Sequence, residues 1–246
     1  MSAASGRNRN SPETSPTFGR LASDGIAVDV SRDWPDQAGQ QQRSPTHQPV
    51  AGEASNSLRA FLDESTANRA GGLQEYLVCA ALVPEDECDS VREQLRTLLL
   101  PGLIKVHWTD EGEPRRRRIV SLIRDLGPMT VVVSHLDAPR RKVERYRRKT
   151  LETMYHEFVD MELFDLTLEC RSAEQDASDR AHIVALQGQG LDSRLRIGHQ
   201  RGGDEPLLWI ADAVLGAVNA AHLGERRHLQ ELESTLLLRV RTPSSL

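Results

Sequence analysis

The chain has 246 residues, a formal net charge of −5 and a mean hydropathy of −0.48. This length suffices for one domain of ordinary size with additional segments, and an aromatic content of only 4% indicates that part of the chain is not packed. The longest apolar stretch holds an acid and an Asn, so we expect no membrane-spanning helix. The three cysteines form no CxxC pair and no zinc-site spacing, which favours reduced thiols and a cytoplasmic location.

Residues 1–57 differ from the rest of the chain. They are rich in Ser, Pro, Gly, Gln and Asn, their apolar residues are scattered, and they show no helical or strand period. Such a composition cannot bury enough apolar surface to offset the lost chain entropy. We therefore predict a disordered tail over residues 1–57 and a single folded domain over residues 58–246.

The remaining chain alternates between strand-like and helix-like patterns. Short apolar or alternating runs predict strands at residues 58–63, 75–83, 103–108, 129–136, 163–169 and 195–198. Helical spacing of apolar residues predicts helices at residues 90–100, 114–126, 140–159, 173–186, 206–221 and 225–239. Strands that first follow one another and then alternate with helices point to a mixed β-sheet flanked by helices, a three-layer α/β domain.

Two acids, far apart in the sequence, end or interrupt hydrophobic elements. Asp212 carries the single formal charge of residues 206–221, and Asp63 lies near the end of the run RAFLDES. An unpaired buried charge is unstable, so such a group neutralises itself, pairs, or binds a metal. Carboxylates from separate elements supply the hard oxygen ligands of Mg²⁺ and Mn²⁺. We expect Asp63 and Asp212 to form a metal site, with Glu169 as the third ligand because it ends an apolar strand.

Structural roles stay open beside the metal-binding one. A strand-end acid such as Glu169 often caps a turn or a helix, and Asp212 can pair with an arginine in the interior. Glu64 follows Asp63 directly, so the pleat points it to the opposite face, where we expect a hydrogen-bonding support role.

Two histidines are secondary candidates. His107, in the segment KVHW, is a candidate phosphate contact or proton carrier, and the alternative is a surface histidine with its own partners. His135 and Asp137 end the valine-rich strand. If that strand neighbours the first strand in parallel, Asp137 rather than Glu169 would reach the cluster.

Positive charge is concentrated in two segments despite the negative total. Residues 115–118 are four consecutive arginines, and residues 139–149 contain seven Lys or Arg in eleven positions. Solvated helix faces explain such runs, and so does binding to a phosphate backbone. The candidate nucleic-acid contacts are Arg115, Arg116, Arg117, Arg118, Arg140, Arg141 and Lys142.

Several of these segments together resemble a known family. The FLDES strand at residues 61–65, the KVHW segment with its Arg-rich helix, and the PLLWIADAVLGAV helix resemble the bacterial family called domain of unknown function 3800, which looks like a member of the ribonuclease-H-like superfamily. The likeness spans residues 58–221. Two departures are Glu169, where the family often has Asp, and Ser-Thr at residues 65–66 in place of Ser-Gly.

The resemblance implies a sheet whose first strand carries Asp63 with Glu64, and a late helix that carries Asp212. It further implies catalysis by two divalent ions, Mg²⁺ or Mn²⁺, held by Asp63, Glu169 and Asp212 during phosphodiester hydrolysis. The resemblance therefore implies a metal-dependent nuclease. The sequence has no G-x-S-x-G, Walker, H-E-x-x-H or Rossmann motif that would favour another catalytic scheme. The alternatives are a non-catalytic nucleic-acid or protein interaction module and a purely structural subunit. The sequence does not distinguish DNA from RNA, single from double strands, or oligomeric states.

Overall fold

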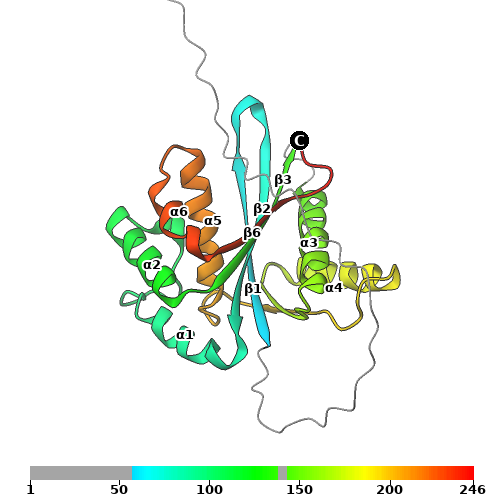
Figure 1. Ribbon diagram of the computed structural model, residues 1–246, viewed down its shortest axis with the longest axis horizontal. Coiled ribbons are helices and arrows are strands. Elements are labelled where there is room, and N and C mark those ends of the chain that lie inside the picture. Colours follow the sequence, from blue (N-terminus) through cyan, green and yellow to red (C-terminus); the bar gives the residue numbers. More distant parts are fainter. Residues whose placement is uncertain (1–56, 138–142) are drawn as a thin grey trace, which may run out of the picture. The chain divides into compact units, whose positions relative to one another are not determined.

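The computed structural model describes residues 57–137 and 143–246 (Figure 1). Almost all of the predicted tail, and the basic residues Arg140, Arg141 and Lys142, lie outside this described part. The six strands form one mixed sheet in the order β5-β4-β1-β2-β3-β6. The strands are β1 (Leu58–Asn68), β2 (Gln74–Pro84), β3 (Met129–Asp137), β4 (Asp165–Glu169), β5 (Arg196–Gln200) and β6 (Leu236–Arg241).

Strands β1, β2 and β3 form an antiparallel meander at the centre of the sheet, and β4 and β6 pair in parallel with β1 and β3. The β1–β2 connection turns through Gly71 and Gly72, whose φ angles of 72° and 74° favour glycine. Val131, Val132 and Val133 of β3 are all fully buried, which confirms the strand covered on both faces.

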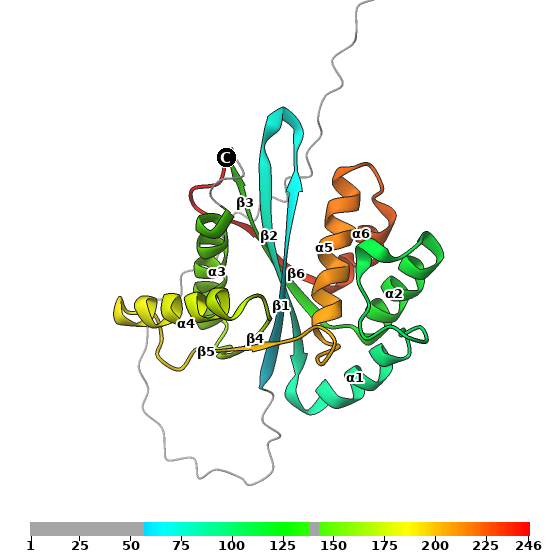
Figure 2. The same ribbon diagram turned by 180° about the vertical axis from the view of Figure 1, so that it is seen from behind.

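Helices cover both faces of the sheet (Figures 1 and 2). One face packs against α1 (Cys88–Arg96), α2 (Glu113–Leu126), α5 (Leu208–His222) and α6 (Arg227–Glu231). The other face packs against α3 (Val143–Asp160) and α4 (Ala173–Gly188). The predicted fold class, a mixed α/β sheet flanked by helices, is therefore confirmed.

Helix α5 positions the candidate site. It lies against β1 and β2, and small side chains at Ala211, Ala213 and Ala217 are fully or almost fully buried in the core on that side. Alanines keep the side-chain layer thin, so the helix backbone approaches the sheet closely. No helix in the described segments is both long and apolar enough to cross a membrane.

The segment 103–108 is not the strand that its pattern predicted. It forms turns that lead into a three-residue 3-10 helix, Trp108–Asp110. Val106 and Trp108 are buried in the core beside α5, whereas Ile104 is 77% exposed. The alternation therefore reflects burial against a helix and not pairing in a sheet.

The predicted helix over residues 225–239 is also wrong. Only α6 is helical there, a 3-10 turn follows, and the chain ends in the edge strand β6. Leu238 and Val240 pack on the α3 face, while Arg239 and Arg241 are exposed. Burial therefore alternates with a period of two, as in a strand, and not with the period of the predicted helix. Strand β1 is longer than predicted, which places Asp63 within the strand and not at its end.

Candidate functional site

The sheet register brings Asp63 and Glu169 together. Leu62 of β1 pairs with Leu168 of the parallel strand β4, and both leucines face α3 and α4. The next residue on each strand, Asp63 and Glu169, therefore points to the α5 face. Two carboxylates from neighbouring strands lie at the same level of the sheet.

Helix α5 adds the third carboxylate. Asp212 lines a pocket of about 410 Å³ together with Asp63 and Glu169. His107, Arg116, Ser65 and Asn219 belong to the same pocket wall. The structure thus brings the three acids predicted from the sequence into one pocket.

The three acids repel one another electrostatically. Burial raises the pKa of Asp63 well above its usual range, and the charges of Glu169 and Asp212 raise it further. Burial also raises the pKa of Asp212, although the Trp108 N–H, His107 and Lys105 oppose that shift. The pocket therefore holds more negative charge than its own residues compensate.

Lys105 is the nearest compensating charge. Its Nζ lies 3.1 Å from Glu169 Oε1, and the pKa of Lys105 is raised because Glu169, Asp63 and Asp212 outweigh the effect of burial. Gly202 closes over this ion pair, because a Cβ at position 202 would lie 2.5 Å from Glu169 Oε1. Lys105 and Gly202 are not among the site residues predicted from the sequence, and no local pattern marks either residue.

Backbone groups and His107 hold the aspartates in place. The Glu64 N–H donates to Asp63 Oδ1 at 2.7 Å, and the Trp108 N–H donates to Asp212 Oδ2 at 2.7 Å. The Nδ1 atom of His107 lies 3.3 Å from Asp212 Oδ1, and its side chain is 42% exposed. His107 therefore lies between Asp212 and solvent.

The side chain of Glu64 points to the opposite face of β1, as the pleat predicts. It accepts a hydrogen bond from Arg147 Nε and lies 3.6 Å from Arg171 Nε. Arg147 is 2% exposed and also pairs with Asp179, so Glu64 belongs to a buried ion-pair network. Only its backbone supports Asp63.

Of the four consecutive arginines, Arg116 alone lines the carboxylate pocket. Arg115 pairs with Glu111, Arg117 pairs with Glu113, and Arg118 donates to the carbonyl of Thr97. The run is therefore distributed around α2, and one member reaches the site.

Asp137 would join the cluster only if β3 paired in parallel with β1, and it does not. Strand β2 lies between β1 and β3, and Asp137 pairs with Gln74, which in turn pairs with Asn68 near the far end of β1. His135 is fully buried, and its Nδ1 lies 2.6 Å from Thr242 Oγ1. These two residues lie away from the carboxylate pocket.

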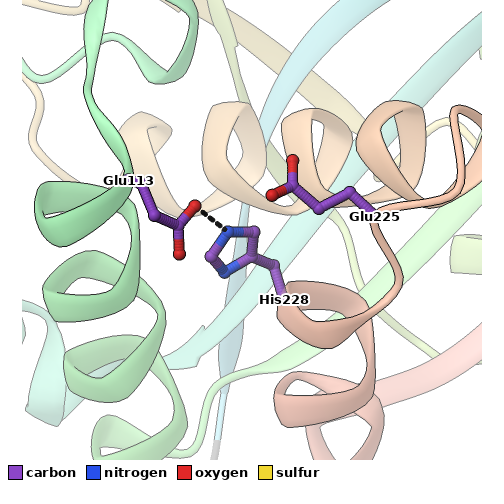
Figure 3. A group of neighbouring side chains, drawn as sticks. All are labelled: Glu113, Glu225 and His228. Atoms are coloured by element: carbon purple, nitrogen blue, oxygen red, sulfur yellow. Dashed lines mark hydrogen bonds and ion pairs between the residues drawn. The ribbon is translucent and has the colours of Figure 1, made fainter.

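Two further groups in the described segments bring three possible metal-ligand atoms within 4.8 Å of one another, namely Glu113 with Glu225 and His228, and Asp176 with Asp179 and His199. The Asp63 cluster does not meet that spacing. Figure 3 shows His228 between the two glutamates, with its hydrogen bond to Glu113. Arginines already occupy both groups: Arg227 Nη2 lies 2.7 Å from Glu113 and 2.6 Å from Glu225, and Arg147 binds Asp179.

No protein-family model matches the chain, and no curated protein matches it. Among solved structures it is similar to Bst-RNase HIII in complex with Mn²⁺, with 14% identity over 81% of this chain and 62% of that one and a TM-score of 0.38. A mutant of Bst-RNase HIII is 16% identical over 81% of this chain and 62% of that one, with a TM-score of 0.37. The PCNA:RNase HII complex from Archaeoglobus fulgidus gives 17% identity over 72% of this chain and 76% of that one, with a TM-score of 0.37. The chain thus spans less than two thirds of Bst-RNase HIII.

Proposed function

We propose that the chain is a ribonuclease-H-like, divalent-metal-dependent hydrolase of nucleic-acid phosphodiester bonds, acting in the cytoplasm. The observation that carries this proposal is the convergence of Asp63, Glu169 and Asp212 in one pocket, where burial and mutual repulsion raise the pKa of Asp63. A carboxylate cluster with excess negative charge is stabilised by a bound cation, and carboxylate oxygens are the ligands that Mg²⁺ and Mn²⁺ prefer.

The donor set fits such ions. Asp63, Glu169 and Asp212 offer six carboxylate oxygens. The positively charged or titratable groups near them are Lys105, the partly exposed His107 and Arg116. Divalent ions bound there would lower the pKa of a coordinated water and stabilise the leaving oxygen of a phosphodiester.

The chain's own residues would bind and orient the substrate. Arg116 lines the pocket and presents a guanidinium suited to a phosphate oxygen. Lys105, which pairs with Glu169, would supply a second positive charge near a bound phosphate. His107, which contacts Asp212 and is partly exposed, is placed to carry a proton between the pocket and solvent.

Metal titration tests this proposal. Isothermal titration of Mn²⁺ into the wild type should show binding that collapses in Asp63→Asn and in Asp212→Asn and persists in Asp137→Asn, the matched control on β3. Incubation with labelled DNA and RNA oligonucleotides should show Mn²⁺-dependent cleavage lost in the same two variants. Absence of Mn²⁺ binding to the wild type would contradict the proposal.

The second candidate is a non-catalytic nucleic-acid interaction module, favoured by the ion pair of Lys105 with Glu169, which already places a cation in the cluster. In that case oligonucleotides bind without Mn²⁺, and Asp212→Asn leaves this binding unchanged.

A further inference from the structure

Trp108 joins the candidate site to the group drawn in Figure 3. Its backbone N–H donates to Asp212 Oδ2 at 2.7 Å, and the preceding residue, His107, places Nδ1 3.3 Å from Asp212 Oδ1. Two consecutive residues therefore approach the two oxygens of one carboxylate. The position of the backbone at 107–108 decides where that carboxylate points.

The ring of Trp108 contacts α5 at Gly216, one helical turn after Asp212. A Cβ at Gly216 would come 2.1 Å from Trp108 Cδ1 and 2.2 Å from Cγ, distances that no side chain tolerates. Asp212 and Gly216 are four residues apart and lie on the same face of the helix. Trp108 thus contacts α5 with its backbone at Asp212 and its ring at Gly216, and glycine alone leaves room for the ring.

Two other residues hold the ring from α2 and α6. The Arg116 guanidinium lies 5.0 Å from the ring centroid and donates to the Trp108 carbonyl at 3.2 Å. The fully buried His228 ring meets Trp108 edge-on at 5.2 Å, and its Nε2 lies 3.1 Å from Glu113 Oε2. The Glu113–His228 pair therefore supports Trp108.

These contacts matter because Trp108 belongs to no α-helix or strand that would hold it. It begins a 3-10 helix of three residues that lacks a side-chain cap. Its buried ring, 3% exposed, is what fixes the segment on α5. Groups that orient a metal-binding side chain contribute strongly to metal affinity, since they hold the ligand in its binding geometry.

We propose that Trp108 is a positioning residue for Asp212, and that Gly216 and His228 act through it. This inference rests on the proposed function, in which Asp212 is a metal ligand. Trp108 itself touches neither metal nor substrate in this role. It sets the direction of the Asp212 carboxylate toward Asp63 and Glu169.

The test compares Gly216→Ala with Gly188→Ala. Both place a methyl group in a helix, but at Gly188 it meets nothing within 4 Å. Gly216→Ala should displace Trp108, weaken Mn²⁺ binding by about 10–100-fold, and leave the far-UV circular dichroism unchanged. Gly188→Ala should bind Mn²⁺ like the wild type.

Hydrogen exchange at the Trp108 amide gives a readout that needs no metal. This amide should exchange faster in Gly216→Ala and in Asp212→Ala, which removes the acceptor oxygen, than in the wild type or Gly188→Ala. If Gly216→Ala does not fold, Trp108→Phe replaces it and should show the same loss of protection at position 108. Unchanged exchange and unchanged Mn²⁺ affinity in a folded variant overturn the positioning role. If the wild type binds no Mn²⁺, the proposed function fails, and amide exchange alone still decides the role of Trp108.

Discussion

Gly202 lies so close to Glu169 that a Cβ at position 202 would be 2.5 Å from the Oε1 atom. The Trp209 indole N–H donates to the Gly202 carbonyl at 2.6 Å and so fixes this loop against the start of α5. A side chain at position 202 would therefore push the end of the Glu169 side chain, which pairs with Lys105. The loop around Gly202 therefore determines where the Glu169 carboxylate lies.

We predict that Gly202→Ala displaces Glu169 from Lys105 and lowers Mn²⁺ affinity about tenfold or more. The neighbouring Gly203→Ala is the control, because its Cβ would meet the exposed Ile104 at ordinary contact distances, 3.4 Å from Cδ1 and 3.6 Å from the carbonyl oxygen. Calorimetric titration of both variants measures the difference. Equal affinities in the two variants would show that the position of Glu169 does not limit metal binding.

The raised pKa of Asp63 makes stability depend on pH. A carboxyl group whose pKa is higher in the folded state binds its proton more tightly there than in the unfolded chain. The contribution of Asp63 to stability is therefore most favourable below the usual pKa of aspartate, and it is lost as the pH rises from that value through the raised pKa of Asp63. Burial and the charges of Glu169 and Asp212 are the causes.

Asp63→Asn should remove this penalty. Without divalent ions at neutral pH, we expect a higher Tm than in the wild type, by about 2–4 °C for each kcal/mol recovered. Added Mn²⁺ should raise the Tm of the wild type and not that of the variant. Thermal scans between acidic and neutral pH measure both effects, with the exposed Asp125→Asn as control. A lower Tm for Asp63→Asn at neutral pH without metal would contradict the expectation.

The elements that sequence patterns predict well are those that are apolar almost throughout, because they are buried on more than one face. The valines of β3 and the apolar run of α5 are examples, and both led to correct elements. Asp63 and Asp212 stood out for the same reason, since each is an acid within an apolar run. A charge inside a hydrophobic element is visible without knowing the fold.

The remaining features depend on contacts between distant segments. Lys105 meets Glu169 across 64 positions of the chain, and nothing near either residue indicates that contact. Residues 103–108 alternate like a strand because Val106 and Trp108 are buried against helices. The C-terminal strand β6 was not predicted, because it comes directly after a helical turn. Leu236–Arg241 is also so short that its apolar residues fit both the strand period and the helix period.

Arg147 joins two carboxylates on the sheet face that α3 and α4 cover. It is 2% exposed and pairs with Glu64 and Asp179. Removing its charge leaves the buried carboxylate of Asp179 and the partly buried carboxylate of Glu64 with Arg171 as their remaining arginine partner. We expect Arg147→Met to lower the free energy of unfolding by about 3–5 kcal/mol. Urea denaturation measures this loss, and Arg148→Met, an exposed neighbour on α3, should change stability little.

Arg116 and Arg117 offer the sharpest test of nucleic-acid binding. Arg116 lines the carboxylate pocket, whereas Arg117 is 60% exposed and pairs with Glu113. EDTA removes divalent ions, so only direct contacts between the protein and the phosphate backbone are measured. Under this condition Arg116→Gln should weaken the affinity for a single-stranded oligonucleotide, and Arg117→Gln should leave that affinity nearly unchanged. Fluorescence anisotropy at several salt concentrations measures both.

The salt dependence identifies the kind of contact that Arg116 makes. Each phosphate neutralised on a single strand contributes about 0.7 to the slope of log affinity against log salt concentration. Arg116→Gln should therefore reduce that slope by about 0.7 if its guanidinium binds one phosphate. A weaker affinity with the slope unchanged would instead mean that Arg116 acts by holding Trp108, whose ring lies 5.0 Å from its guanidinium. The two roles of Arg116 are thus separable, because only a phosphate contact releases a counterion.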